Sequence, residues 1–302
     1  MLIKLLRPLA TAHATAVLDL EDGLWDVTSH ERTRERKSWG RRALAALCAE
    51  RPELFHQQRI GIRVNRMDSA EFTLDLAALQ VASRAGPLAC VILPKVESPA
   101  DLDDCHATLA RAGIKYDQLV PIVETRRGLA NLTGIVAGAC QRGVCWVVYG
   151  HYDYSLDSLQ WPFLDHDESN FWEHVTPIIQ TIEHAGLQYI HPPLFQMYDD
   201  SRLQLIVEQL AARCRHEFGM LTVGSRQSRR CIGPIAPEAG RAMLRPSAPR
   251  SAAETRTLAE ETVASYQTRR RAEFGFAVDA RSGRFISPHE YLAAVRYLGS
   301  ET

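Results

Sequence analysis

Several short apolar segments of this 302-residue chain lead directly into charged residues or histidine. In residues 144–153, VCWVVYGHYD, an apolar run ends on His151 and Asp153, and the run at 119–125, LVPIVET, ends on Glu124. Two carboxylates that follow consecutive parallel strands can hold a hard cation, because Mg²⁺ takes oxygen ligands and often uses only one or two protein carboxylates. We therefore predict that Glu124 and Asp153 bind Mg²⁺, with Mn²⁺ as the alternative ion.

A cation held in this way would stabilise negative charge that develops on a substrate oxygen. Arg63, at the end of the run IGIRVN, is suited to bind the same oxygens through its planar guanidinium. The alternative for Arg63 is a salt bridge to a neighbouring acid such as Glu97. The predicted chemistry is carbon–carbon bond cleavage or formation next to a carbonyl group, through the enolate of a small 2-oxo acid or an acyl thioester.

Two further residues at strand ends are candidates for the reaction. His191, in LQYIHPP, is the leading candidate for proton transfer, since imidazole titrates near neutrality. A buried, hydrogen-bonded structural role is the alternative for His191 and also for His151. Lys95 lies in a predicted strand and makes Schiff-base catalysis the main rival of the metal mechanism.

The elements that position these residues alternate along the chain. Continuous apolar runs, typical of strands buried on both faces of a parallel sheet, alternate with stretches of helical periodicity. The seven runs are 14–22, 60–65, 89–97, 119–125, 144–153, 187–193 and 219–225. Such repeats predict an α/β fold, most simply a (β/α)8 TIM barrel. The eighth strand is either residues 2–6, LIKLL, or missing.

The repeat ends near residue 240. We predict a TIM-barrel catalytic domain at 1–240, followed by a linker and a C-terminal helical extension or lid at 241–302. In the extension, residues 257–274 are expected to form a helix, and Ser287 and Pro288 are expected to begin the last one.

Composition excludes several classes of partner and site. The chain has 35 basic and 36 acidic residues, so its net charge favours neither nucleic acid nor a membrane surface. We see no apolar run of the roughly 18 residues that span a membrane. The seven cysteines form no CxxC pair, which fits a reducing cytoplasm better than a disulfide framework or a zinc site.

Taken together, these segments resemble the HpcH/HpaI aldolase and citrate lyase β-subunit superfamily. The matching motifs are AVLDLEDGLWD from residue 16, RVN at 63–65, VILPKVESPADL from residue 91, PIVETRRGLANL from residue 121, YGHYD at 149–153 and FAVDARSGRFISPHEYLAAVRYL from residue 276.

The resemblance implies roles for individual residues. It makes Glu124 and Asp153 the metal ligands, Arg63, Lys95 and Gly150 substrate-binding residues, and Glu21 and Asp22 acids that reach the metal through water. For Glu21 and Asp22 a helix cap is the alternative. The resemblance also implies a homo-oligomer, a trimer or a hexamer, in which the C-terminal segment packs over a neighbouring subunit's site.

The chain also departs from the family pattern. Gly219-Met220 stands where Gly-Lys is usual, only Gln227 remains of the Ile-His-Pro-x-Gln segment, and His191 stands where many relatives have an acid. These departures indicate a divergent branch, similar to the group called "C–C bond lyase of the TIM-barrel fold", rather than an enzyme that uses citryl-CoA or malyl-CoA.

Two alternatives to a lyase stay open. One is phosphoryl transfer of the phosphoenolpyruvate type on the same barrel, in which Arg226, Arg229 and Arg230 hold phosphate. The other is a barrel protein without catalytic activity.

Overall fold

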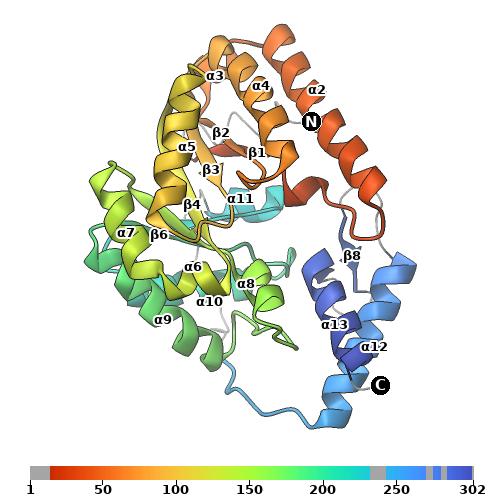
Figure 1. Cartoon of the computed structure of the whole chain (residues 1–302). Coiled ribbons are helices and arrows are strands. Elements are labelled where there is room, and N and C mark those ends of the chain that lie inside the picture. The colour runs from red at the N-terminus through yellow and green to blue at the C-terminus, as the bar shows by residue number, and fades with distance from the viewer. Residues whose placement is uncertain (1–13, 232–242, 270–274, 280–283, 301–302) are drawn as a thin grey trace. The chain divides into compact units, whose positions relative to one another are not determined.

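Parallel strands in chain order form the main sheet. The computed structural model describes residues 14–231, 243–269, 275–279 and 284–300 (Figure 1). The strands of the main sheet are β1 (Ala16–Asp19), β2 (Ile60–Arg63), β3 (Leu88–Leu93), β4 (Tyr116–Val123), β5 (Trp146–Tyr149), β6 (Gln188–His191) and β7 (Gly219–Met220). The sheet follows the order β1 to β7, and the pairs β1–β2, β2–β3, β3–β4 and β6–β7 are parallel.

Helices separate these strands along the chain, and a second, small sheet lies in the C-terminal segment. The helices up to β7 are α2 (His30–Glu50), α3 (Leu54–Gln57), α4 (Ala70–Ala85), α5 (Pro99–Arg111), α6 (Arg126–Ala130), α7 (Leu132–Gln141), α8 (His151–Asp157), α9 (Ser169–His184) and α10 (Asp200–Arg213), with a 3₁₀ turn η1 (Asp22–Leu24). The later elements are α11 (Ser225–Cys231), α12 (Ala252–Arg269), the antiparallel hairpin of β8 (Ala277–Val278) and β9 (Phe285–Ile286), and α13 (Pro288–Ser300).

Local sequence explains where these elements begin and what they bury. All six residues of β3 are buried, as expected of a strand covered on both faces. Helix α5 begins with a capping box between Ser98 and Asp101 and has Pro99 in its first turn. Helix α4 begins in a similar way, because the Ser69 side chain accepts a hydrogen bond from the backbone of Phe72.

The structure confirms the α/β class and all seven predicted strands. It does not confirm an eight-stranded barrel: within the described residues the main sheet has seven strands, and the segment 2–6 lies outside them. The C-terminal helical extension is present, and its first helix begins at Ala252, earlier than predicted, because residues 252–256 already have helical backbone.

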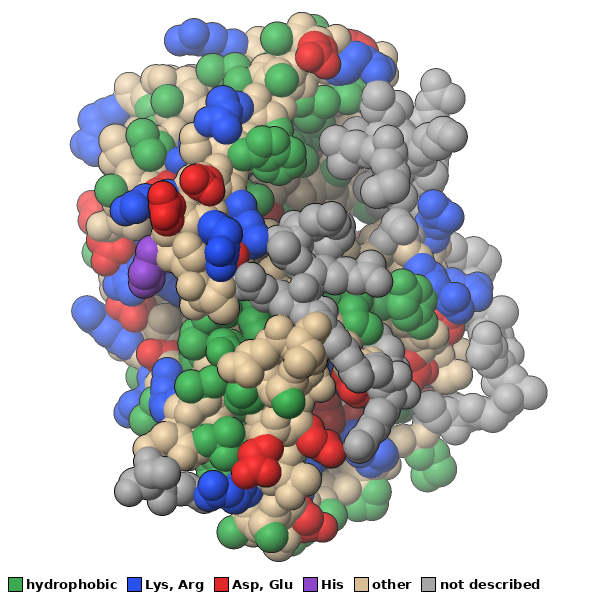
Figure 2. Space-filling view, turned by 90° about the vertical axis from the view of Figure 1, so that its right-hand side faces the viewer, with side chains coloured by type: hydrophobic (Ala, Val, Ile, Leu, Met, Phe, Trp, Pro, Cys, Tyr) green, Lys and Arg blue, Asp and Glu red, His purple; other side chains and the backbone are tan. Residues whose placement is uncertain are grey.

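The described chain divides into two compact units. The N-terminal unit comprises residues 14–123, 127–148 and 185–187, and the C-terminal unit comprises 124–126, 149–184 and the described residues from 188 onward. Acidic and basic side chains are interspersed on the surface shown in Figure 2, in keeping with the balanced charge of the chain. None of the described helices combines the length and the apolar character that a membrane span requires.

Candidate active site

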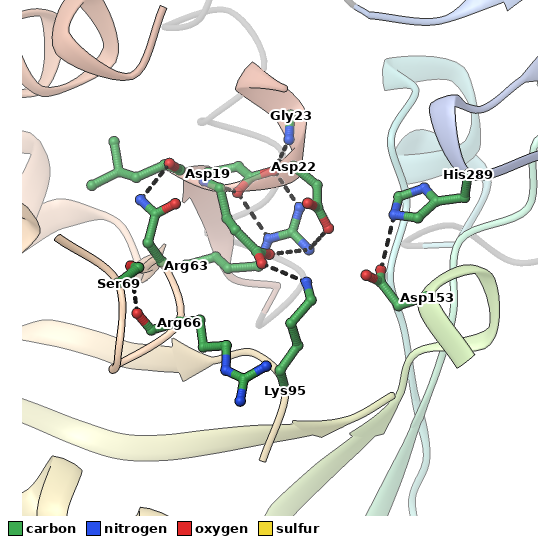
Figure 3. Close-up of polar contacts among 12 residues, drawn as sticks. Asp19, Asp22, Gly23, Arg63, Arg66, Ser69, Lys95, Asp153 and His289 are labelled. Carbon is green, nitrogen blue, oxygen red and sulfur yellow. Dashed lines mark hydrogen bonds and ion pairs between the residues drawn. The ribbon is translucent and has the colours of Figure 1, made fainter. Parts of the chain in front are cut away.

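In the N-terminal unit, Arg63 at the end of β2 binds three acids that end or follow β1. The parallel register places Asp19 beside Arg63. The Arg63 guanidinium binds both carboxylate oxygens of Asp19, at 2.8 and 2.5 Å, and its Nη1 lies 3.2 Å from Glu21 and 3.5 Å from Asp22. Lys95 Nζ donates to Glu21 Oε1 at 2.8 Å (Figure 3). We call these five residues the Arg63 cluster.

Opposite charges in the Arg63 cluster stabilise one another. Burial by itself would raise the pKa of Asp19, but the charge and hydrogen bonds of Arg63 outweigh burial and lower it. Burial likewise opposes the charge of Arg63, and the neighbouring acids, Asp19 first and then Glu21, raise the pKa of Arg63 well above its ordinary value. The cluster therefore keeps its charges.

The Arg63 cluster differs in detail from the predicted pairing. A salt bridge to a neighbouring acid such as Glu97 was the alternative to substrate binding for Arg63. The salt-bridge partners of Arg63 in the structure are Asp19, Glu21 and Asp22, and Glu97 instead lies 3.7 Å from both Arg66 and Arg127. The reason is that Asp19 pairs with Arg63 along the sheet, whereas Glu97 follows the next strand.

Lys95 has unusual backbone geometry directly after β3. Its φ of 54° falls in the left-handed region, which non-glycine residues seldom adopt. The roles predicted for Lys95, Glu21 and Asp22, toward a substrate and toward metal-bound water, remain predictions.

In the C-terminal unit, the Glu124 side chain occupies space that is free only because residue 150 is a glycine. Glu124 directly follows β4 and is 2% exposed. A Cβ atom added at Gly150 would lie 2.3 Å from Glu124 Oε2 and 2.4 Å from its Cβ, so the absence of a side chain at Gly150 makes room for this carboxylate. Gly150 immediately precedes helix α8.

Asp153 lies in the first turn of α8, and the same unit therefore holds both predicted metal ligands. The Asp153 side chain is 15% exposed, and its Oδ2 lies 3.1 Å from Nε2 of His289, at the start of α13 (Figure 3). The donors are hard carboxylate oxygens, with Gly150 beside one of them. These residues fit a divalent cation that prefers oxygen ligands.

His191, the predicted proton-transfer residue, is fully buried in the C-terminal unit. Its Nε2 lies 3.1 Å from Nδ1 of His166, its Nδ1 lies 3.3 Å from the Tyr189 hydroxyl, and Trp172 stacks on its ring. Burial lowers the pKa of His191 to about 3. Because the side chain is 0% exposed and held neutral, the structure argues against direct proton exchange between His191 and a substrate.

His151 and His166 belong to the same group. His151 donates from Nε2 to the backbone oxygen of Leu164 at 2.9 Å, and burial lowers its pKa to about 3. Burial, followed by the proximity of His191 and His151, lowers the pKa of His166 well below its ordinary value. We call His151, His166 and His191 the histidine cluster.

A cavity of about 840 Å³ lies elsewhere in the C-terminal unit. Arginines and acids line it together, including Arg226, Asp279 and Glu290, with Trp161 at one side. Arg226 binds both oxygens of Asp200, at 3.1 and 2.9 Å, and Arg230 approaches the same carboxylate at 2.8 Å. These pairs neutralise the arginines that a phosphate group would require.

Sequence reasoning missed His289 and His166. The predicted helix start at Ser287-Pro288 already placed His289 in the first turn of a helix, but nothing in the local sequence indicated that this helix contacts Asp153. His166 lies in an irregular segment without periodicity, so no local signal pointed to its burial.

Comparison with known proteins agrees with the arrangement of strands and acids. The HpcH/HpaI aldolase/citrate lyase family model matches residues 5–196, more than half of the chain. The chain belongs to this family. Membership supports lyase or aldolase activity in general and leaves the exact reaction open. No curated protein is significantly similar to the chain.

Solved structures show the same fold as this HpcH/HpaI family member. The citrate lyase beta subunit of Mycobacterium tuberculosis, complexed with oxaloacetate and magnesium, is 20% identical with a TM-score of 0.56, covering 78% of this chain and 92% of that chain. RipC of Yersinia pestis is 21% identical with a TM-score of 0.53, covering 76% and 93%. The protein CitE of M. tuberculosis with magnesium, acetoacetate and coenzyme A is 19% identical with a TM-score of 0.53, covering 96% and 91%.

Proposed function

We propose that this protein is a Mg²⁺-dependent carbon–carbon lyase or aldolase acting on a small 2-oxo acid or an acyl thioester. The observation that carries the proposal is the buried Glu124 carboxylate, seated against Gly150 in the compact unit that also contains Asp153. Family membership supports it, as do the fold relatives solved with magnesium and oxaloacetate or acetoacetate.

Glu124 and Asp153 are the residues that would hold the ion. When bound, Mg²⁺ supplies a positive charge that stabilises negative charge developing on a substrate oxygen. Gly150 keeps space for Glu124, and the burial of Glu124 restricts water on that side of the carboxylate. Mn²⁺ can use the same oxygen donors.

The other predicted roles are part of the same proposal. Arg63 and Lys95 bind substrate oxygens, and Glu21 and Asp22 orient Arg63. The catalytic domain is proposed to span 1–240, with 241–302 as its extension, in a trimer or hexamer that light scattering would identify. His191 is left out of the reaction because it is buried.

Schiff-base catalysis through Lys95 is disfavoured by its contact with Glu21. A carboxylate 2.8 Å from Nζ stabilises the charged ammonium, whereas the nucleophile in such catalysis is the neutral amine. Borohydride reduction in the presence of pyruvate, followed by mass spectrometry, tests this point. Covalent labelling of Lys95 would replace the metal mechanism.

The direct test of the proposed function is metal-dependent exchange of the pyruvate methyl protons with D₂O, followed by proton NMR. An enzyme that forms the enolate of a 2-oxo acid catalyses this exchange without a second substrate. We expect Glu124→Gln and Asp153→Asn each to lower both Mg²⁺ affinity and the exchange rate by about 100-fold or more, because each removes one of two charged ligands.

Glu173→Gln is the matched control, since Glu173 is an exposed acid on α9 in the same unit. It should retain wild-type affinity and exchange. If the two ligand variants bind Mg²⁺ as the wild type does, the metal site is misassigned. If the wild type catalyses neither exchange nor cleavage of any 2-oxo acid or acyl thioester, the lyase proposal fails.

A further inference from the structure

The C-terminal helix α13 brings a histidine to one of the proposed metal ligands. His289 is 7% exposed, and its Nε2 faces Oδ2 of Asp153 at 3.1 Å (Figure 3). Neither the family motif around Asp153 nor the carboxylate pair requires an imidazole at this place. The position of His289 therefore needs its own explanation.

The start of α13 is held firmly, so the position of His289 is set by the fold. Ser287 and Glu290 form a reciprocal cap in which the Ser287 backbone donates to Glu290 Oε2 at 3.0 Å and the Glu290 backbone donates to Ser287 Oγ at 3.1 Å. Glu290 also binds the Arg284 guanidinium. These contacts lie on both sides of His289 in the sequence and restrict its backbone.

A second contact ties α13 to the helix that carries Asp153. Arg296 Nη1 donates to the backbone oxygen of Leu156 at 2.9 Å, further along both helices. On its other side α13 packs against α12, where the rings of Tyr266 and Tyr291 stack at 4.4 Å. With two points of attachment between α8 and α13, the pairing of Asp153 with His289 is a consequence of helix packing.

The distance between the two side-chain atoms matches that of neighbouring metal ligands. In octahedral coordination with bonds of about 2.1 Å, two ligand atoms at right angles lie about 3 Å apart. Asp153 Oδ2 and His289 Nε2 are 3.1 Å apart and face one another. The pair can therefore occupy adjacent positions around one ion with little movement of either side chain.

We propose that His289 binds a divalent cation together with Asp153, and that its imidazole shifts the metal preference toward Mn²⁺ and Co²⁺. This inference rests on the metal site of the proposed function. An imidazole nitrogen is a better donor to these transition metals than to Mg²⁺, which prefers oxygen. The C-terminal extension thus contributes to metal selectivity.

The competing explanation is a hydrogen bond in which His289 only orients the Asp153 carboxylate. The two explanations predict different losses of affinity for different metals when His289 is replaced. A ligand nitrogen contributes more to Co²⁺ than to Mg²⁺ affinity, whereas a hydrogen-bonding partner that orients a ligand supports every metal alike.

The test uses the full-length protein and the His289→Gln variant, with Co²⁺ binding followed by visible absorption and Mg²⁺ binding by calorimetry. If His289 is a ligand, the variant loses about tenfold or more in Co²⁺ affinity and changes the Co²⁺ absorption spectrum, while Mg²⁺ affinity changes by less than about threefold. An equal loss for both metals, or an unchanged Co²⁺ spectrum, overturns the proposal.

Two controls separate this proposal from the one it rests on. His184→Gln removes an exposed histidine of α9 in the same unit and should leave the Co²⁺ titration unchanged. Asp153→Asn should weaken binding of both metals. If Asp153→Asn binds both metals as the wild type does, the metal site itself is wrong, whatever His289→Gln shows. Circular dichroism of each variant establishes that it is folded.

Discussion

The Arg63 cluster and the histidine cluster both consist of titratable groups at or near strand ends, yet they hold opposite states of charge. In the Arg63 cluster, the salt bridge between Asp19 and Arg63 outweighs the effect of burial, lowering the pKa of Asp19 and raising that of Arg63. In the histidine cluster, the buried aromatic surroundings offer no countercharge, and burial lowers the pKa of His191 to about 3.

The difference shows that position at a strand end does not decide a residue's role. A buried charge survives where a partner compensates the lost solvation, and an imidazole without such a partner stays neutral. The Arg63 cluster can therefore supply charge to a ligand, whereas the histidine cluster stabilises the fold through packing and hydrogen bonds.

The largest effect is expected from Arg63→Ala. This change leaves the carboxylates of Asp19, Glu21 and Asp22 without their common guanidinium, and we expect a loss of about 3 kcal/mol or more in unfolding free energy at pH 7. Urea unfolding followed by circular dichroism measures it.

Arg66→Ala is the control for Arg63→Ala, because Arg66 is 45% exposed and its salt bridge to Asp68 lies at the surface. Its loss should be about 0.5 kcal/mol or less. Equal losses of unfolding free energy for the two substitutions would mean that Arg63 stabilises the fold no more than an exposed salt bridge does.

The pH dependence of stability distinguishes the two clusters. The folded pKa values of His151 and His191 are about 3, below the ordinary 6.5, so the unfolded chain binds more protons between these values. Their contribution is complete above pH 6.5 and is lost as the pH falls, by roughly 3 kcal/mol for each histidine near pH 4.5. The Asp19 contribution is lost only below its unfolded pKa of 3.8.

The variant His191→Gln tests this assignment through the pH dependence of the unfolding free energy, not through its absolute value. Between pH 6 and 4.5, removal of one such histidine should reduce the slope of unfolding free energy against pH by about 1.4 kcal/mol per pH unit. His216→Gln, at an exposed position, should keep the wild-type slope. An unchanged slope in His191→Gln would show that His191 does not remain neutral in the folded protein.

The smallest effect is expected from Tyr189→Phe. The Tyr189 hydroxyl contacts Nδ1 of His191 at 3.3 Å inside the histidine cluster, and its removal should lower the unfolding free energy by about 1 kcal/mol. Tyr198→Phe removes a hydroxyl from a side chain that is 68% exposed and should change stability by less than about 0.5 kcal/mol. A similar effect of both would mean that the Tyr189–His191 contact adds nothing to stability.

Local patterns were sufficient for the order of elements and for several of their boundaries. The apolar run of β3 and the Ser98-Pro99 start of α5 were both predictable, because burial on two faces and helix capping depend on neighbouring residues. The start of α13 at Pro288 followed from the same kind of signal. The pairing of Glu124 with Gly150 had no such signal, because it depends on the approach of two segments.

The residues that were misjudged depend on distant partners. For Arg63 the sequence offered Glu97 as one candidate salt-bridge partner, but the sheet register gives it Asp19, 44 residues away in sequence. His191 was expected to act on a substrate, but packing against Trp172 and His166 encloses it. The eighth strand of a barrel was placed at residues 2–6 or taken as missing, and residues 2–6 lie outside the described residues, in which the main sheet has seven strands.

The sequence by itself determined the βα repeat, the helix caps and the identity of the acids that end the strands, because these depend on periodicity and on residues close along the chain. Only the tertiary structure decided which charges meet, which histidines become neutral and which helix contacts Asp153. Those outcomes depend on burial and on contacts between distant segments, since solvation and countercharge, not residue type alone, set the state of an ionisable side chain.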